Sequence, residues 1–205
     1  MTNALFIGNS HLAALKLGWA DAAPAGLEVT FFGAPKKTWL AFAPLPGNQY
    51  GFDSTGKQRG HRKVAEAVNG TANVTLDNRD AIVLVGEANA HAALASLLSF
   101  CDISGIRETG AATLMSVDLF AKCCRSLAEK ALPAPFWWNR ADLAPIAVLP
   151  QPAPAETIRA STNRTSWAWN QLAATPAVLT AAHEALDDAL DLTFAANGLT
   201  YLPQP

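Results

Sequence analysis

The fold is decided at the start of the chain, by the stretch Ala4-Leu5-Phe6-Ile7-Gly8-Asn9-Ser10-His11. Its apolar run stops at Gly8, and residues 11–21 then follow a helical pattern. This order predicts a buried strand, a tight turn and a helix that begins beside Ser10. Parallel α/β sheets bind ligands at the carboxyl ends of their strands, so the turn is the first candidate for a functional site.

Strand and helix patterns alternate along the rest of the chain. Apolar runs predict strands at residues 27–32, 81–86, 145–149 and 199–202, and helical periodicity marks 90–100, 113–131 and 178–195. Short strands are expected around 47–53 and 72–76, in a region broken by proline and glycine. The alternation predicts a three-layer α/β/α sandwich with a mostly parallel, flavodoxin-like central sheet.

Composition restricts the function classes. The chain has 205 residues, of which 50% are hydrophobic and 16% charged, with a formal net charge of −2. These values predict one domain over residues 1–205 and no nucleic-acid partner. The start lacks a signal-peptide pattern and no run is long enough to span a membrane, so the expected location is the cytoplasm. Cys101, Cys123 and Cys124 fit neither a disulfide framework nor a zinc site, and neither a cofactor nor a metal is expected.

Ser10 has two interpretations. A serine hydroxyl becomes a nucleophile when a base takes its proton and hydrogen-bond donors stabilise the resulting oxyanion. Backbone N–H groups at the start of a helix are unpaired and offer such donors. Serine and asparagine are also preferred helix caps, and a strand-to-helix turn needs one. Ser10 is therefore a candidate for catalysis or for capping.

The stretch Gly8-Asn9-Ser10 resembles the first motif of the SGNH (GDSL-like) hydrolases. The resemblance implies an α/β/α fold and makes Ser10 the nucleophile. It further implies that the N–H of Gly33, after the second strand, and the side chain of Asn89 donate to the oxyanion. Asn89 follows Gly86 one residue later than the family's Gly-x-Asn motif places it.

Each of these positions has a structural alternative. Gly33 could serve only the turn, and Asn89 could cap the next helix. Asn9 and His11 are expected to support the site from beside Ser10. His11 is not expected to be the base, because adjacent side chains on a helix do not face each other.

The sequence lacks the motif in which the family carries its catalytic base. The family's Asp-x-x-His block occurs nowhere in this sequence, and His61, His91 and His183 lie in other contexts. The chain stops at Pro205, directly after a predicted strand, where the family places that block. We expect the sequence to be a piece of a longer protein, and the alternative is a natural member without the base.

Three functions remain open. The first is a serine ester hydrolase of the esterase or acetylesterase type, acting on a small-molecule or carbohydrate ester. The second is a catalytically inactive binding domain with the same fold. The third, a nucleotide- or flavin-binding domain, is disfavoured because both glycine-rich phosphate motifs are absent. The tryptophans near 137–138 and 167–169 either line a sugar site or pack a loop onto the core.

Overall fold

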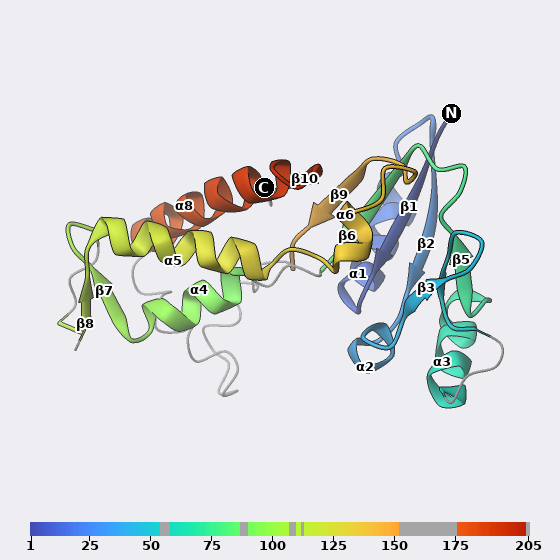
Figure 1. The fold of residues 1–205 in the computed structure, drawn as a ribbon, viewed down its shortest axis with the longest axis horizontal. Coiled ribbons are helices and arrows are strands. Elements are labelled where there is room, and N and C mark those ends of the chain that lie inside the picture. The colour runs from blue at the N-terminus through green and yellow to red at the C-terminus, as the bar shows by residue number, and fades with distance from the viewer. Residues whose placement is uncertain (54–57, 87–89, 107–109, 112, 152–175, 204–205) are drawn as a thin grey trace. The chain divides into compact units, whose positions relative to one another are not determined.

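The computed structural model describes residues 1–53, 58–86, 90–106, 110–111, 113–151 and 176–203 (Figure 1). The chain forms two compact units. Unit 1 comprises Met1–Ala88, Pro133–Pro150 and Gly198–Leu202; unit 2 comprises Asn89–Leu132, Gln151–Asn197 and Pro203–Pro205. This division into two compact units leaves the single domain expected over residues 1–205 as a prediction.

Unit 1 is built on a five-stranded sheet in the order β10-β9-β6-β1-β2, in which every pair of neighbours is parallel. The strands are β1 (Thr2–Gly8), β2 (Leu27–Gly33), β6 (Ala81–Val85), β9 (Ile146–Leu149) and β10 (Leu199–Tyr201). The predicted mostly parallel α/β fold is confirmed, with helices flanking the sheet as in a three-layer α/β/α arrangement. Gly8 pairs with Gly33 and with Val85, so β1, β2 and β6 end at one edge.

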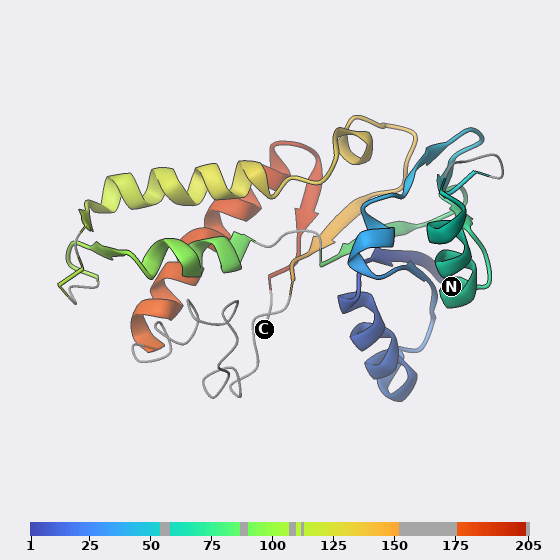
Figure 2. The same cartoon turned by 90° about the horizontal axis from the view of Figure 1, so that it is seen from below.

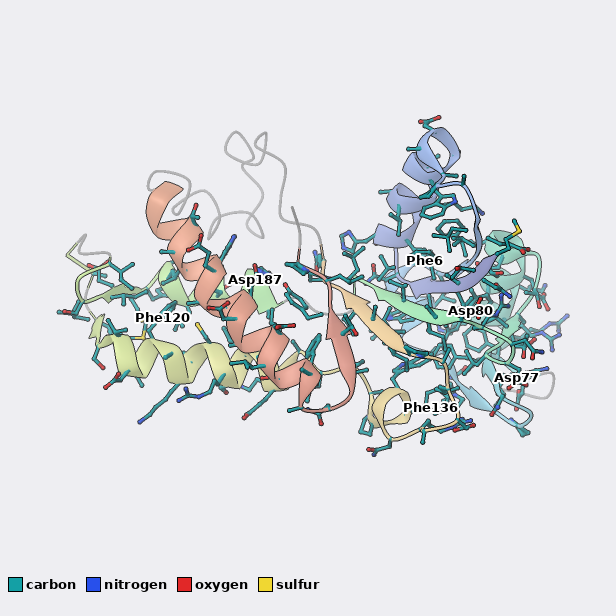
Figure 3. The ribbon with its side chains drawn as sticks, turned by 90° about the horizontal axis from the view of Figure 1, so that it is seen from above. Phe6, Asp77, Asp80, Phe120, Phe136 and Asp187 are labelled. Atoms are coloured by element: carbon teal, nitrogen blue, oxygen red, sulfur yellow. The ribbon has the colours of Figure 1, made fainter. Side chains whose placement is uncertain are left out.

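One face of this sheet is covered by α1 (His11–Ala22). Leu12 is buried against Val83 and Val85, and Phe6 and Phe31 pack around them (Figure 3 labels Phe6). Trp19 adds its ring to Phe6 and Phe31 at centroid distances of 5.7 and 6.1 Å. The helix predicted over residues 11–21 is thus confirmed.

The opposite face carries Phe32, because neighbouring strand residues point to opposite sides. Phe32 stacks on Phe42 at 5.0 Å and joins a buried aromatic cluster that includes Tyr50 and Trp137. Around it lie α2 (Lys36–Trp39), α3 (Arg59–Asn69), α6 (Pro135–Trp138) and an antiparallel sheet of β3 (Ala43–Leu45), β4 (Gln49–Gly51) and β5 (Asn73–Thr75). The short strands expected around 47–53 and 72–76 are therefore present.

Unit 2 consists mainly of helices, which Figure 2 shows side by side: α4 (Ala90–Leu98), α5 (Val117–Lys130) and α8 (Pro176–Ala195). A parallel pair joins β7 (Cys101–Ile103) to β8 (Thr113–Met115). The helix predicted over 113–131 was therefore wrong at its start. Its first three residues pair with β7, and Ser116 begins the helix by accepting a hydrogen bond from Leu119 N–H. Among the described residues no helix is long and apolar enough to cross a bilayer.

Candidate functional site

Ser10 lies in the turn between β1 and α1, where its side chain is exposed. Its backbone is helical, with φ −57° and ψ −22°, and its hydroxyl makes no cap hydrogen bond to α1. A capping serine ordinarily has an extended backbone and accepts a bond from the first helical turn. The side chain of Ser10 is therefore not used to hold the helix.

Asn9 instead holds the turn in place. Its Oδ1 accepts a hydrogen bond from the His11 N–H at 3.0 Å, and its Nδ2 donates to the Gly86 carbonyl at 2.7 Å. These two bonds tie the end of β1 to the end of β6. The side chain of Asn9 thus fixes the turn in which Ser10 lies.

Gly86 follows β6 and has φ +76°, a conformation that side chains rarely tolerate. A Cβ on Gly86 would lie 2.7 Å from Asn9 Oδ1 and 2.9 Å from His11 Cδ2. His11 is half-buried beside this glycine, and burial lowers the pKa of its imidazole. His11 thus packs beneath the turn and favours the neutral form.

Gly33 is the last residue of β2, and its amide is already engaged. The Gly33 N–H donates to Asn69 Oδ1 at 3.0 Å, while Asn69 Nδ2 donates to the Gly33 and Ala65 carbonyls at 2.9 Å each. A Cβ at Gly33 would lie 2.5 Å from the Gly8 carbonyl oxygen and 2.7 Å from a Leu12 methyl group. Close packing requires a glycine here, and an oxyanion would have to replace Asn69 at the N–H.

A hollow of about 240 Å³ opens beside Ser10 within unit 1. The turn and α1 contribute Asn9, Ser10, Leu12, Ala13 and Lys16. The end of β2 and the residues after it contribute Phe31, Gly33, Ala34 and Pro35, and the end of α3 contributes Val68 and Asn69. The structure therefore brings Asn9, Ser10 and Gly33 together at one site. Asn89 lies outside the described residues, as does Glu87.

None of the described histidines lines this hollow. His61 Nδ1 lies 3.1 Å from Thr38 Oγ1, and its ring stacks on Phe52. In unit 2, His91 Nε2 lies 2.9 Å from Asp187 Oδ1, and the His91 and His183 rings meet edge to face at 5.0 Å. Burial lowers the pKa of His183, the charge of His91 lowers it further, and Asp187 opposes both effects.

One feature of the site and one contact in unit 2 were missed by sequence reasoning. Asn69 is 36 residues from Gly33, and no motif joins them; the only signal was the Asn69-Gly70 pair, which is typical of a turn. Asp187 is 96 residues from His91, and no motif joins these two residues either. Of the tryptophan stretches, Trp137 is buried against Tyr50 at 4.7 Å, while Trp167 and Trp169 lie outside the described residues.

The described residues contain no group of three side chains suited to a metal ion. A scan against models of protein families found no match, and searches of curated proteins and of solved structures found no significant match.

Proposed function

We propose that this chain is an SGNH-like serine ester hydrolase, with Ser10 as its nucleophile. The observation that carries the proposal is the exposed Ser10 side chain, which does not cap α1 and which lines the hollow where β1 and β2 end. A serine with only a structural task would use its hydroxyl to cap α1. In the described residues neither the hydroxyl nor the N–H of Ser10 has a hydrogen-bond partner.

In the proposed reaction the Ser10 Oγ attacks the ester carbonyl carbon and forms a tetrahedral oxyanion. The C–O bond to the alcohol then breaks, and the alcohol leaves with the proton that Ser10 gave up. Water then attacks the acyl carbon of the serine ester, the bond to Ser10 Oγ breaks, and the acid leaves while Ser10 regains its proton. The Ser10 N–H at the start of α1 is the available oxyanion donor, and the Gly33 N–H joins it once Asn69 is displaced. Asn89 is proposed as a third donor from the resemblance alone.

The proton acceptor is not among the residues that line the hollow. The resemblance places it in an Asp-x-x-His block that residues 1–205 do not contain. We therefore expect this chain by itself to hydrolyse esters slowly. Binding and oxyanion stabilisation without the triad still leave roughly 10³-fold catalysis over water in serine hydrolases. The substrate is proposed to be a small-molecule or carbohydrate ester, and a cytoplasmic location stays a prediction.

The second candidate function is binding without turnover. It is favoured by the Gly33 N–H, which Asn69 occupies, and by the lack of a described histidine at the hollow. This candidate predicts that the fold and the hollow hold a ligand while Ser10 stays unreactive.

A serine-directed phosphonate separates the two candidates. The protein is incubated with the probe, digested, and the adduct is located by mass spectrometry. The hydrolase proposal predicts an adduct on Ser10 that forms slowly, because no described histidine lines the hollow, that disappears in Ser10→Ala and that persists in Ser96→Ala, whose hydroxyl bonds the Ala92 carbonyl in unit 2. An adduct on another residue, or none on Ser10 after prolonged incubation, leaves the binding function as the better account.

A further inference from the structure

The hollow beside Ser10 is lined mostly by apolar side chains. Ser10 and Asn9 stand where β1 ends, and the walls are Leu12 and Ala13 from α1, Phe31 from β2, Ala34 and Pro35 after it, and Val68 from α3. Lys16 is the only charged residue among those that the structure places at the hollow. Such walls suit an aliphatic chain and offer few partners to the hydroxyls of a sugar.

Val68 marks the apolar wall most clearly. The side chain is 51% exposed near the end of α3. On the other side of the hollow, Ala13 is exposed as well. A ligand chain lying between them would cover apolar surface that now faces water, and this burial would favour binding.

The size of the hollow limits the length of the chain. The hollow has a volume of about 240 Å³, enough for several methylene groups beside Ser10. Along α1, the six residue steps from Ser10 to Lys16 span about 9 Å at the rise of an α-helix. The hollow therefore extends from the candidate nucleophile along the first two turns of α1.

We propose that the hollow is an acyl-chain groove, and that the ester split at Ser10 carries a medium-chain aliphatic acyl group. The inference rests on the proposed function for the position of the ester, and on the groove alone for the chain. Since the acyl carbon bonds to Ser10 Oγ during the reaction, the chain attached to it would lie in the hollow that opens at that atom. Val68 then belongs to the apolar wall that the chain covers.

Binding tests the groove without any chemistry at Ser10. Octanoate and butyrate are titrated into the protein by calorimetry. A fully buried methylene contributes about fourfold in affinity, and one covered on a single side about twofold. We expect octanoate to bind at least about tenfold more tightly than butyrate.

The variant Val68→Trp fills the groove and should weaken octanoate binding at least about tenfold. Val64→Trp is its matched control, because Val64 is an exposed valine on the same helix that does not line the hollow. Val68→Asp, which places a charge at the same position, serves as a second test if the tryptophan perturbs the helix. Circular dichroism checks that each variant is folded.

Reaction at Ser10 tests the ester separately. Octanesulfonyl and butanesulfonyl fluoride each form an O–S bond to a serine, release fluoride and leave the hydroxyl proton to solvent. Faster labelling of Ser10 by the octyl reagent supports both proposals. Octanoate binding that depends on Val68, without any labelling of Ser10, supports the groove and overturns the hydrolase. If both reagents label Ser10 equally fast, the groove is overturned and the hydrolase proposal stands. The same conclusion follows if Ser10 is labelled but Val68→Trp leaves octanoate binding unchanged.

Discussion

Gly33 is confined by backbone and side-chain atoms on the side where a Cβ would project. The nearest are the Gly8 carbonyl oxygen at 2.5 Å and a Leu12 methyl group at 2.7 Å. Gly33→Ala is expected to lower the free energy of unfolding by about 1–3 kcal/mol, because the carbonyl belongs to the neighbouring strand and cannot yield cheaply. Urea unfolding followed by circular dichroism measures the loss.

Gly18→Ala is the control for this substitution. Gly18 lies within α1, and a Cβ there meets no atom within 4 Å. An alanine in a helix interior is favoured over glycine by roughly 0.5–1 kcal/mol, so this variant should gain stability. Equal effects of the two substitutions would contradict the close packing at Gly33.

Asn69 fastens the end of α3 to the end of β2 through two hydrogen bonds with Gly33, and its Nδ2 also donates to the Ala65 carbonyl within α3. Asn69→Ala leaves one half-buried N–H and two carbonyls without this partner and should cost about 2–3 kcal/mol in the free energy of unfolding. Asn69→Asp keeps an acceptor for the Gly33 N–H and loses only the donors, so it should retain part of that stability. An Asn69→Asp variant no more stable than Asn69→Ala would show that the bond to the Gly33 N–H contributes little.

Residue by residue, the sequence predicted the site only in part. Asn9, Ser10 and Gly33 were found because each stands at the end of an apolar run, and parallel strands bring such ends to one edge. Asn69 was not found, because its partner is set by how α3 packs on β2. The engaged Gly33 N–H could not be foreseen for the same reason.

At the starts of α1 and α5, two serines perform different tasks. Ser116 has an extended backbone and accepts a bond from Leu119 N–H, whereas Ser10 is helical and caps nothing. Ser116→Ala is therefore expected to cost about 1 kcal/mol. Ser10→Ala should stay within about 0.5 kcal/mol of the unsubstituted protein. Chemical denaturation of both variants is the measurement, and a Ser10→Ala loss as large as that of Ser116→Ala would restore capping as the role of Ser10.

Among the elements, long regular patterns were predicted well and short pairings were not. The apolar run over residues 81–86 predicted β6, and the helical pattern over residues 11–21 predicted α1. Residues 113–115 were assigned to a helix because three residues are too few to show a strand period. Pairing with β7, a tertiary contact, decides their conformation.

For the molecule as a whole, alternation of strands and helices was enough to predict a parallel sheet. It did not predict the contact between His91 on α4 and Asp187 on α8, which lie far apart in the sequence (Figure 3 labels Asp187). Contacts of this kind depend on how helices pack within unit 2, and amphipathic pattern alone leaves that packing open.

The group of His91, His183 and Asp187 in unit 2 makes the stability of the protein depend on pH. Burial, and then the nearby His91, lower the pKa of His183 below its ordinary value of 6.5. Below pH 6.5 the unfolded chain therefore binds more protons at this position than the folded one, and stability falls as the pH falls toward the lowered pKa. Above 6.5 this contribution is fully present.

Urea unfolding at pH 7.5 and pH 5.5 measures the effect. The unsubstituted protein should lose stability at the lower pH, and His183→Gln should lose less, because a neutral side chain replaces the imidazole. His11, whose pKa burial also lowers, accounts for part of the loss that remains. An unchanged pH dependence in His183→Gln would contradict the assignment.

Any reaction at Ser10 requires its side chain to open into a solvent-reachable hollow where it can meet a substrate. Ser10→Cys tests this access directly, because a thiol reacts with an alkylating reagent without a neighbouring base. The chain supplies its own reference in Cys124, which is 1% exposed and whose pKa burial raises to about 11. Iodoacetamide is added at pH 8, and the modified peptides are followed over time by mass spectrometry. We predict that the thiol introduced at position 10 reacts at least about tenfold faster than Cys124; reaction at the same slow rate would contradict the account.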